Sequence, residues 1–256
     1  MNGLDLNNTN KFIVEKLTKR LGENLFAVIS TGSVASKNYK KSWSDIDILM
    51  VVVKIELKTK RIIAETINSL SKKFKQRFGI NVISRKNAES PILPSQSLNG
   101  KTLQALLDLK TSPERMLFCK IKEPKFYYPD EKEIRRYSLL NVGILVLNNR
   151  RNLTMQVPKT IEEYKCMVEK TIRLAFIITK LSIQYFNLTN CITNRDIINE
   201  AQKLFKDFKF DVLKRNLRII SRWSNINNYS YLGKTLQLTD DFIEKFSYYV
   251  FTKTKK

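Results

Sequence analysis

The sequence contains no histidine, and this absence excludes several classes of enzyme chemistry. Without an imidazole there is no Ser-His-Asp triad, no Cys-His pair, no histidine-ligated metal and no histidine-dependent ribonuclease mechanism. The three cysteines are far apart and form no Cys-x-x-Cys pair, which argues against a zinc ribbon and against a disulfide framework. We therefore expect a reduced, cytoplasmic protein.

Acidic residues are few, with 24 Asp and Glu against 46 Lys and Arg, so the formal net charge is +22. Such an excess of positive charge favours a polyanionic partner: a nucleic acid, a nucleotide or an anionic membrane surface. The codon bias of an AT-rich genome is an alternative explanation, but that bias would raise the number of acidic residues as well. We expect a nucleotide or nucleic-acid partner.

Long apolar runs are also missing. The most apolar segment, residues 139–147, is too short to cross a bilayer, and residues 1–11 lack the apolar stretch of a signal peptide. We expect a soluble protein with no membrane partner. Glycine and proline are too sparse for a collagen-like or low-complexity chain, and 43% hydrophobic residues allow a sizeable core.

Hydrophobic periodicity predicts an α+β protein with two domains, residues 1–120 and 121–256. The first domain reads as a small sheet whose strands are separated by helices. Its expected elements are a helix at 10–21, strands at 25–30 and 46–53, a basic helix at 57–78 closed by Gly79, and a strand at 80–84. The second domain reads as a helical bundle. Its expected helices are 130–149, one starting near Pro158, 193–205, 211–223 and 239–251.

The segment 29–53 carries the residues with the clearest chemistry. Asp45 and Asp47 open a predicted strand, where residues two apart point to the same side. Two crowded carboxylates repel each other unless a cation lies between them, and Mg²⁺ favours one or two protein carboxylates with phosphate oxygens and water. Upstream, Gly32 permits close approach of the backbone to a phosphate, and Ser33 can donate a hydrogen bond to it. Lys37 and Lys41 lie between these two parts and could neutralise a phosphate tail.

This combination of a strand, Gly32-Ser33 and then Ser-Asp-Ile-Asp-Ile-Leu at 44–49 resembles the signature of the DNA polymerase β-like nucleotidyltransferase superfamily. The resemblance is to its minimal and antibiotic nucleotidyltransferase branch. It implies a small mixed-sheet nucleotidyltransferase domain followed by a C-terminal helical bundle. It also implies Mg²⁺ or Mn²⁺ held by Asp45 and Asp47, and a nucleoside triphosphate bound by Gly32 and Ser33, with ATP as the default donor.

A third carboxylate on the next strand completes the family's site, but Asn81 stands at that place here. Asn can ligate a metal through its carbonyl oxygen but cannot accept a proton. Three explanations stay open: Glu89 reaches back from the following loop, the acceptor is deprotonated without a protein base, or the enzyme is weakened or inactive.

The leading expectation is a nucleotidyltransferase that moves a nucleoside monophosphate from a triphosphate to an acceptor and releases pyrophosphate. The positive charge favours RNA, such as tRNA, or another anionic macromolecule as the acceptor, and disfavours cationic aminoglycosides. The alternative is a catalytically weakened domain acting as a regulatory or antitoxin-like binding module, which Asn81 supports. A plain RNA-binding protein ranks third, because it leaves the arrangement of glycine and paired aspartates to coincidence.

Overall fold

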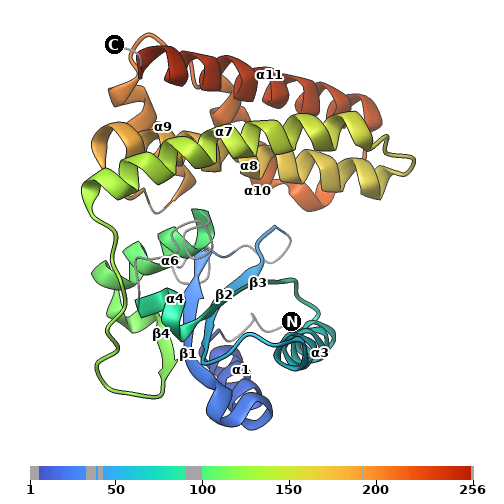
Figure 1. The fold of residues 1–256 in the computed structure, drawn as a ribbon. Helices are drawn as coiled ribbons and strands as arrows, with labels where there is room; N and C mark the ends of the chain where they lie inside the picture. Colours follow the sequence, from blue (N-terminus) through green and yellow to red (C-terminus); the bar gives the residue numbers. More distant parts are fainter. Residues whose placement is uncertain (1–5, 33–38, 40–42, 90–99, 192, 255–256) are drawn as a thin grey trace. The chain divides into compact units, whose positions relative to one another are not determined.

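The protein is an α+β protein that divides into two compact units, Met1–Pro129 and Asp130–Lys256. The structure is a computed structural model that describes residues 6–32, 39, 43–89, 100–191 and 193–254. The first unit is built around a sheet, and the described part of the second is helical (Figure 1).

A four-stranded mixed sheet forms the centre of the first unit, in the order β3-β2-β1-β4. The strands are β1 (Leu25–Thr31), β2 (Ile46–Val52), β3 (Phe78–Ser84) and β4 (Met116–Cys119). β2 runs antiparallel to β1 and parallel to β3, and β4 pairs antiparallel to β1. The two central strands, β1 and β2, are almost entirely buried, as expected for apolar and β-branched runs covered on both faces.

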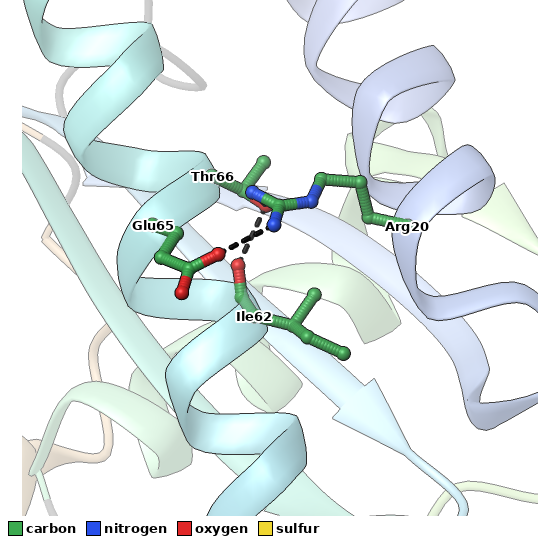
Figure 2. Close-up of polar contacts among 4 residues, drawn as sticks. All are labelled: Arg20, Ile62, Glu65 and Thr66. Atoms are coloured by element: carbon green, nitrogen blue, oxygen red, sulfur yellow. Dashed lines mark hydrogen bonds and ion pairs between the residues drawn. The ribbon is translucent and has the colours of Figure 1, made fainter.

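One face of the sheet packs against α1 (Leu6–Leu21) and α3 (Leu57–Phe74). Alternate residues of β2, among them Ile46 and Ile48, join the apolar faces of both helices in one core. A polar contact also joins the helices. The Arg20 guanidinium pairs with Glu65 at 2.5 Å and donates to the Thr66 hydroxyl at 3.2 Å (Figure 2). The Thr66 hydroxyl in turn donates to the carbonyl of Ile62 at 2.7 Å, so α1 is fixed against one turn of α3.

Two helices contact the sheet from the side away from α3: α4 (Arg85–Glu89) and α6 (Gly100–Thr111) (Figure 1). The elements predicted from hydrophobic periodicity include neither of these helices nor β4, and the predicted end of α3 lies too late. The helix ends where Lys75 adopts the left-handed conformation, with φ +51°, and its amide donates to the carbonyl of Ser71. Gly79 therefore lies inside β3 rather than at a helix end.

The second unit contains five α-helices within its described residues. They are α7 (Glu131–Met155), α8 (Ile161–Asn187), α9 (Asn194–Leu204), α10 (Asp211–Ser221) and α11 (Tyr229–Lys253). α8 packs against α7, α9 and α11 and is the most buried of the five. Hydrophobic periodicity predicts the start of the last helix at residue 239. The helix begins ten residues earlier, because the Asn228 side chain accepts the amide of Tyr231 and caps it.

Local capping sets the start of three of these helices. In α7, α8 and α9 the N-cap side chain accepts an amide three residues on, and the acidic side chain there accepts the N-cap amide. Aromatic rings of the α9–α10 connection, Phe205, Phe208 and Phe210, pack against Phe242 and Phe246 of α11 in the core. Among the described residues, no helix has both the length and the apolarity needed to cross a membrane.

Candidate functional site

Asp45 and Asp47 lie at the start of β2, on the face of the sheet opposite to α1 and α3. The intervening Ile46 and the following Ile48 enter the core beneath those helices, so the two aspartates project the other way. Both aspartates are half-buried. The positions of Ile46 and Ile48 are consistent with the predicted placement of two carboxylates on one face at the start of the strand.

The backbone of Gly32 lies directly against the carboxylate of Asp47. Asp47 is paired with Thr31, the last residue of β1, so the next residue along the chain turns over the aspartate. Gly32 has φ +65°, and a Cβ atom placed on it would lie 2.5 Å from Oδ2 of Asp47. Only glycine accommodates both the positive φ and this approach. On the other side, the register partner of Asp47 in β3 is Gly79, which has no side chain.

Asp45 is held by the cationic side chain of the residue that precedes β3. Nε of Arg77 lies 3.0 Å from Oδ1 of Asp45, and Nη2 of Arg77 donates to the carbonyl of Trp43 at 2.8 Å. The Arg77 carbonyl accepts the amide of Ile46 at 2.9 Å. Because the Arg77 side chain is 54% exposed, this pair adds little to stability. Its effect is to orient the segment that carries Asp45.

Tyr39 lies close to the same ion pair. Its hydroxyl donates to the side-chain carbonyl of Gln76, the residue before Arg77. Burial raises the pKa of Tyr39 above its usual value, the negative charge of Asp45 raises it further, and Arg77 acts in the opposite direction. The phenol therefore remains protonated at neutral pH.

Asn81 shares a face of the sheet with Asp47. Its neighbours Ile80 and Val82 pack into the core under α1 and α3, so the Asn81 side chain projects to the other face, like that of Asp47. In the parallel register, Asp47 is opposite Gly79 and Leu49 is opposite Asn81. Asn81 therefore lies two residues further along β3 than the residue opposite Asp47.

Glu89, the other candidate for a third ligand, is engaged elsewhere. Its carboxylate pairs with Arg85 at 2.8 Å within α4, and the Arg85 guanidinium lies 4.3 Å from the centre of the Phe26 ring. Within the described residues, no group of three Asp, Glu, Cys or His side chains is arranged to hold a metal ion. Glu89 therefore does not complete a carboxylate triad with Asp45 and Asp47.

The donor set fits a hard cation in type. By strand alternation two carboxylates share one face, the backbone of Gly32 lies close against one of them, and an amide oxygen follows on the next strand. The other predicted phosphate-binding residues, Ser33, Lys37 and Lys41, fall outside the described part of the chain.

Sequence reasoning missed Arg77, because its place beside Asp45 depends on the register between β2 and β3. The parallel register pairs Ile46 with Phe78, so the residues that precede them, Asp45 and Arg77, are brought side by side. Comparison with known protein families and with curated proteins gave no match. The interpretation of this site consequently rests on its residues and geometry.

Proposed function

We propose that the protein is a Mg²⁺-dependent nucleotidyltransferase that moves a nucleoside monophosphate from a nucleoside triphosphate to an acceptor and releases pyrophosphate. ATP is the default donor, and Mn²⁺ is an alternative to Mg²⁺. The observation that carries the proposal is the approach of Gly32 to Asp47, with φ +65° and no space for a Cβ. A chain that turns this tightly over a strand-start carboxylate is suited to presenting phosphate oxygens to the metal that the carboxylate holds.

Each described residue has a defined role in this proposal. Asp45 and Asp47 would hold the cation, and the amide oxygen of Asn81 is a further neutral donor on the same face. When bound, the cation would neutralise charge on the attacking and leaving oxygens of the phosphoryl transfer. Arg77 is a positioning residue that orients Asp45. Ser33, Lys37 and Lys41 stay predictions for binding the triphosphate.

The charge of the chain supports an anionic acceptor. A net charge of +22 attracts polyanions over long distances and raises their local concentration. We therefore propose RNA, such as tRNA, or another anionic macromolecule as the acceptor. A cationic drug would be repelled by the same field.

Asn81 favours a second candidate, a catalytically weakened nucleotide-binding module with a regulatory or antitoxin-like role. An amide in the place of the expected acid removes the proton acceptor, while Asp45 and Asp47 keep the capacity to bind a metal–nucleotide complex. This candidate binds nucleotide without transferring it, whereas the leading proposal requires transfer.

Label transfer distinguishes the two candidates. The purified chain is incubated with each α-³²P-labelled nucleoside triphosphate, Mg²⁺ or Mn²⁺, and total RNA, beside the variants Asp47→Ala and Asp241→Ala. Asp241 is an exposed acid of α11 and serves as the matched control. We expect labelled RNA with the wild type and Asp241→Ala and none with Asp47→Ala. Nucleotide binding without any labelled product would instead support the regulatory module, and label unaffected by Asp47→Ala would exclude this site.

A further inference from the structure

The helical unit contains a basic pocket of about 560 Å³ formed by α10, the short 3₁₀ turn η3 (Trp223–Asn225) and the start of α11. Its lining consists of three arginines, an exposed tyrosine, an asparagine and two apolar side chains: Arg215, Arg218, Arg222, Tyr231, Asn225, Ile219 and Ile226. We call it the arginine pocket. All of these residues belong to the second unit, so the pocket is complete without the sheet.

Positive charge in the arginine pocket is not balanced locally. Residues 212–239 contain five basic and no acidic side chains. In the part of the chain that the structure describes, no carboxylate lies within ion-pair distance of Arg215, Arg218 or Arg222. Like charges three and four residues apart on a helix repel each other by a few tenths of a kcal/mol per pair. An anion in the pocket would relieve this repulsion.

The arginines follow from the amphipathic pattern of α10. Leu213, Ile219 and Ile220 are buried against the unit, while Arg215, Arg218 and Arg222 recur at helical spacing along one side. Arg215 is the best held of the three. Its Nη2 lies 3.4 Å from the hydroxyl of Thr235, and its guanidinium lies 5.5 Å from the centre of the Tyr231 ring.

Tyr231 adds a flat apolar surface beside these charges. The residue lies in the first turn of α11 and is 40% exposed, and the Arg215 guanidinium lies over its ring. Guanidinium groups bind phosphates through paired N–H donors, and exposed aromatic rings stack nucleic-acid bases. The two features occur together in proteins that bind single strands, because a base must leave its duplex stack to reach the ring.

We propose that the arginine pocket binds a short segment of single-stranded nucleic acid, with phosphates on the arginines and a base on Tyr231. An enclosed small-molecule site is a poorer fit, because Arg218, Arg222 and Tyr231 are all exposed, whereas such sites bury most of their ligand. The proposal rests on the nucleotidyltransferase function in one respect: if the protein transfers a nucleotide, the single strand bound in the arginine pocket would be the acceptor. Binding is measured without triphosphate, so its failure and a failure of transfer are separate results.

The test measures binding of fluorescein-labelled oligouridylate and oligodeoxythymidylate to the full chain by fluorescence anisotropy at several salt concentrations. The variant Arg218→Ala/Arg222→Ala removes two exposed pocket charges. Its matched control, Lys170→Ala/Lys245→Ala, removes two exposed charges of the same unit outside the pocket. For two lost phosphate contacts we expect the slope of log affinity against log salt to become shallower by about 1.4. The control should keep the wild-type slope.

Substitutions of Tyr231 test the stacking part of the proposal. Tyr231→Ala should weaken single-strand binding about tenfold, in keeping with the contribution of one stacked base, while Tyr231→Phe retains the ring and the affinity. Binding of duplex RNA should not respond to either substitution. A preference for oligouridylate or for oligodeoxythymidylate identifies the sugar, and either supports the proposal. Equal losses in the arginine and control variants, or full single-strand affinity in Tyr231→Ala, would overturn it.

Discussion

Gly32 turns over Asp47 so closely that its Cα has no room for a side chain unless the aspartate moves. A Cβ there would lie 2.5 Å from Oδ2 and 3.2 Å from Cβ of Asp47. The contact joins the end of β1 to the start of β2 and holds the aspartate in one place. Gly22, at the other end of β1, also has a positive φ of +51°, but a Cβ placed there meets no described atom within 4 Å.

This pair of glycines allows backbone strain to be separated from the contact with Asp47. Both Gly22→Ala and Gly32→Ala place a side chain in the left-handed region, which should lower the free energy of unfolding by about 1–3 kcal/mol. Only Gly32→Ala also displaces the Asp47 carboxylate. We therefore expect Gly32→Ala to abolish label transfer, and Gly22→Ala to retain it at a temperature where both variants are folded. Equal transfer activity of the two variants would show that the contact has no part in the reaction.

Asn81→Asp should restore the missing acid. The side chain lies on the same face as Asp47 and on the adjacent parallel strand, so an aspartate adds a proton acceptor and a third negative charge there. We expect the rate of label transfer to rise at least about tenfold, since a positioned general base contributes roughly 10²–10⁴-fold. The added charge should also lower the melting temperature in EDTA more than in Mg²⁺.

Asn68→Asp provides the control for this gain of activity, because Asn68 is an exposed residue of α3 and the change in charge is the same. It should alter neither the rate nor the effect of Mg²⁺ on melting. If Asn81→Asp lowers the rate instead, the amide itself has a role that an acid cannot replace.

Asp240→Asn should stabilise the helical unit at neutral pH. Burial and the nearby carboxylate of Glu244 raise the pKa of Asp240, although Asn149 donates to its Oδ1 at 2.7 Å. A raised pKa means that the folded state favours the protonated acid. This favourable contribution is full below the unfolded pKa and is lost as the pH rises through the folded pKa. Above that point the charged side chain destabilises the fold, and the neutral amide removes the cost.

Thermal unfolding at two pH values measures this effect. The variant should melt at a higher temperature than the wild type at pH 7, and the difference should vanish near pH 3, below the ordinary pKa of an aspartate of about 3.9. The hydrogen bond from Asn149 can be kept by the amide oxygen of the substituted side chain. A variant that melts lower at pH 7 would mean that the attraction of Arg150 outweighs burial.

Strong local patterns made much of the fold predictable. The apolar runs at 25–30 and 46–53 and the amphipathic helices of the second half correspond to observed elements, and the α+β class is confirmed. Most of the predictions that were wrong or missing concern features that the local sequence pattern does not mark. The end of α3 at Lys75 carries no glycine to mark it, and β4 is a four-residue strand whose pairing with β1 joins distant parts of the chain. α6 has buried Ala105, Leu106 and Leu109 at helical spacing, so its signal was present but overlooked.

For the candidate site, the sequence predicted residue types and a shared face but not contacts. Asp45 and Asp47 follow from the alternation of a strand. The approach of Gly32 to Asp47 depends on the register between β1 and β2, and the pairing of Asp45 with Arg77 depends on the register between β2 and β3. Neither register can be derived from the spacing of the residues alone, because a connection of a given length can join two strands in more than one register.

The pairing of β1 with β4 has a consequence for how the protein is made. β1 is synthesised first among the strands, yet one of its edges is covered only by Met116–Cys119. During translation this apolar edge stays open while residues 32–115 are added, a delay of several seconds at ordinary rates of synthesis. Open strand edges invite pairing with other chains. The nascent chain is therefore most exposed to aggregation before its fourth strand has left the ribosome.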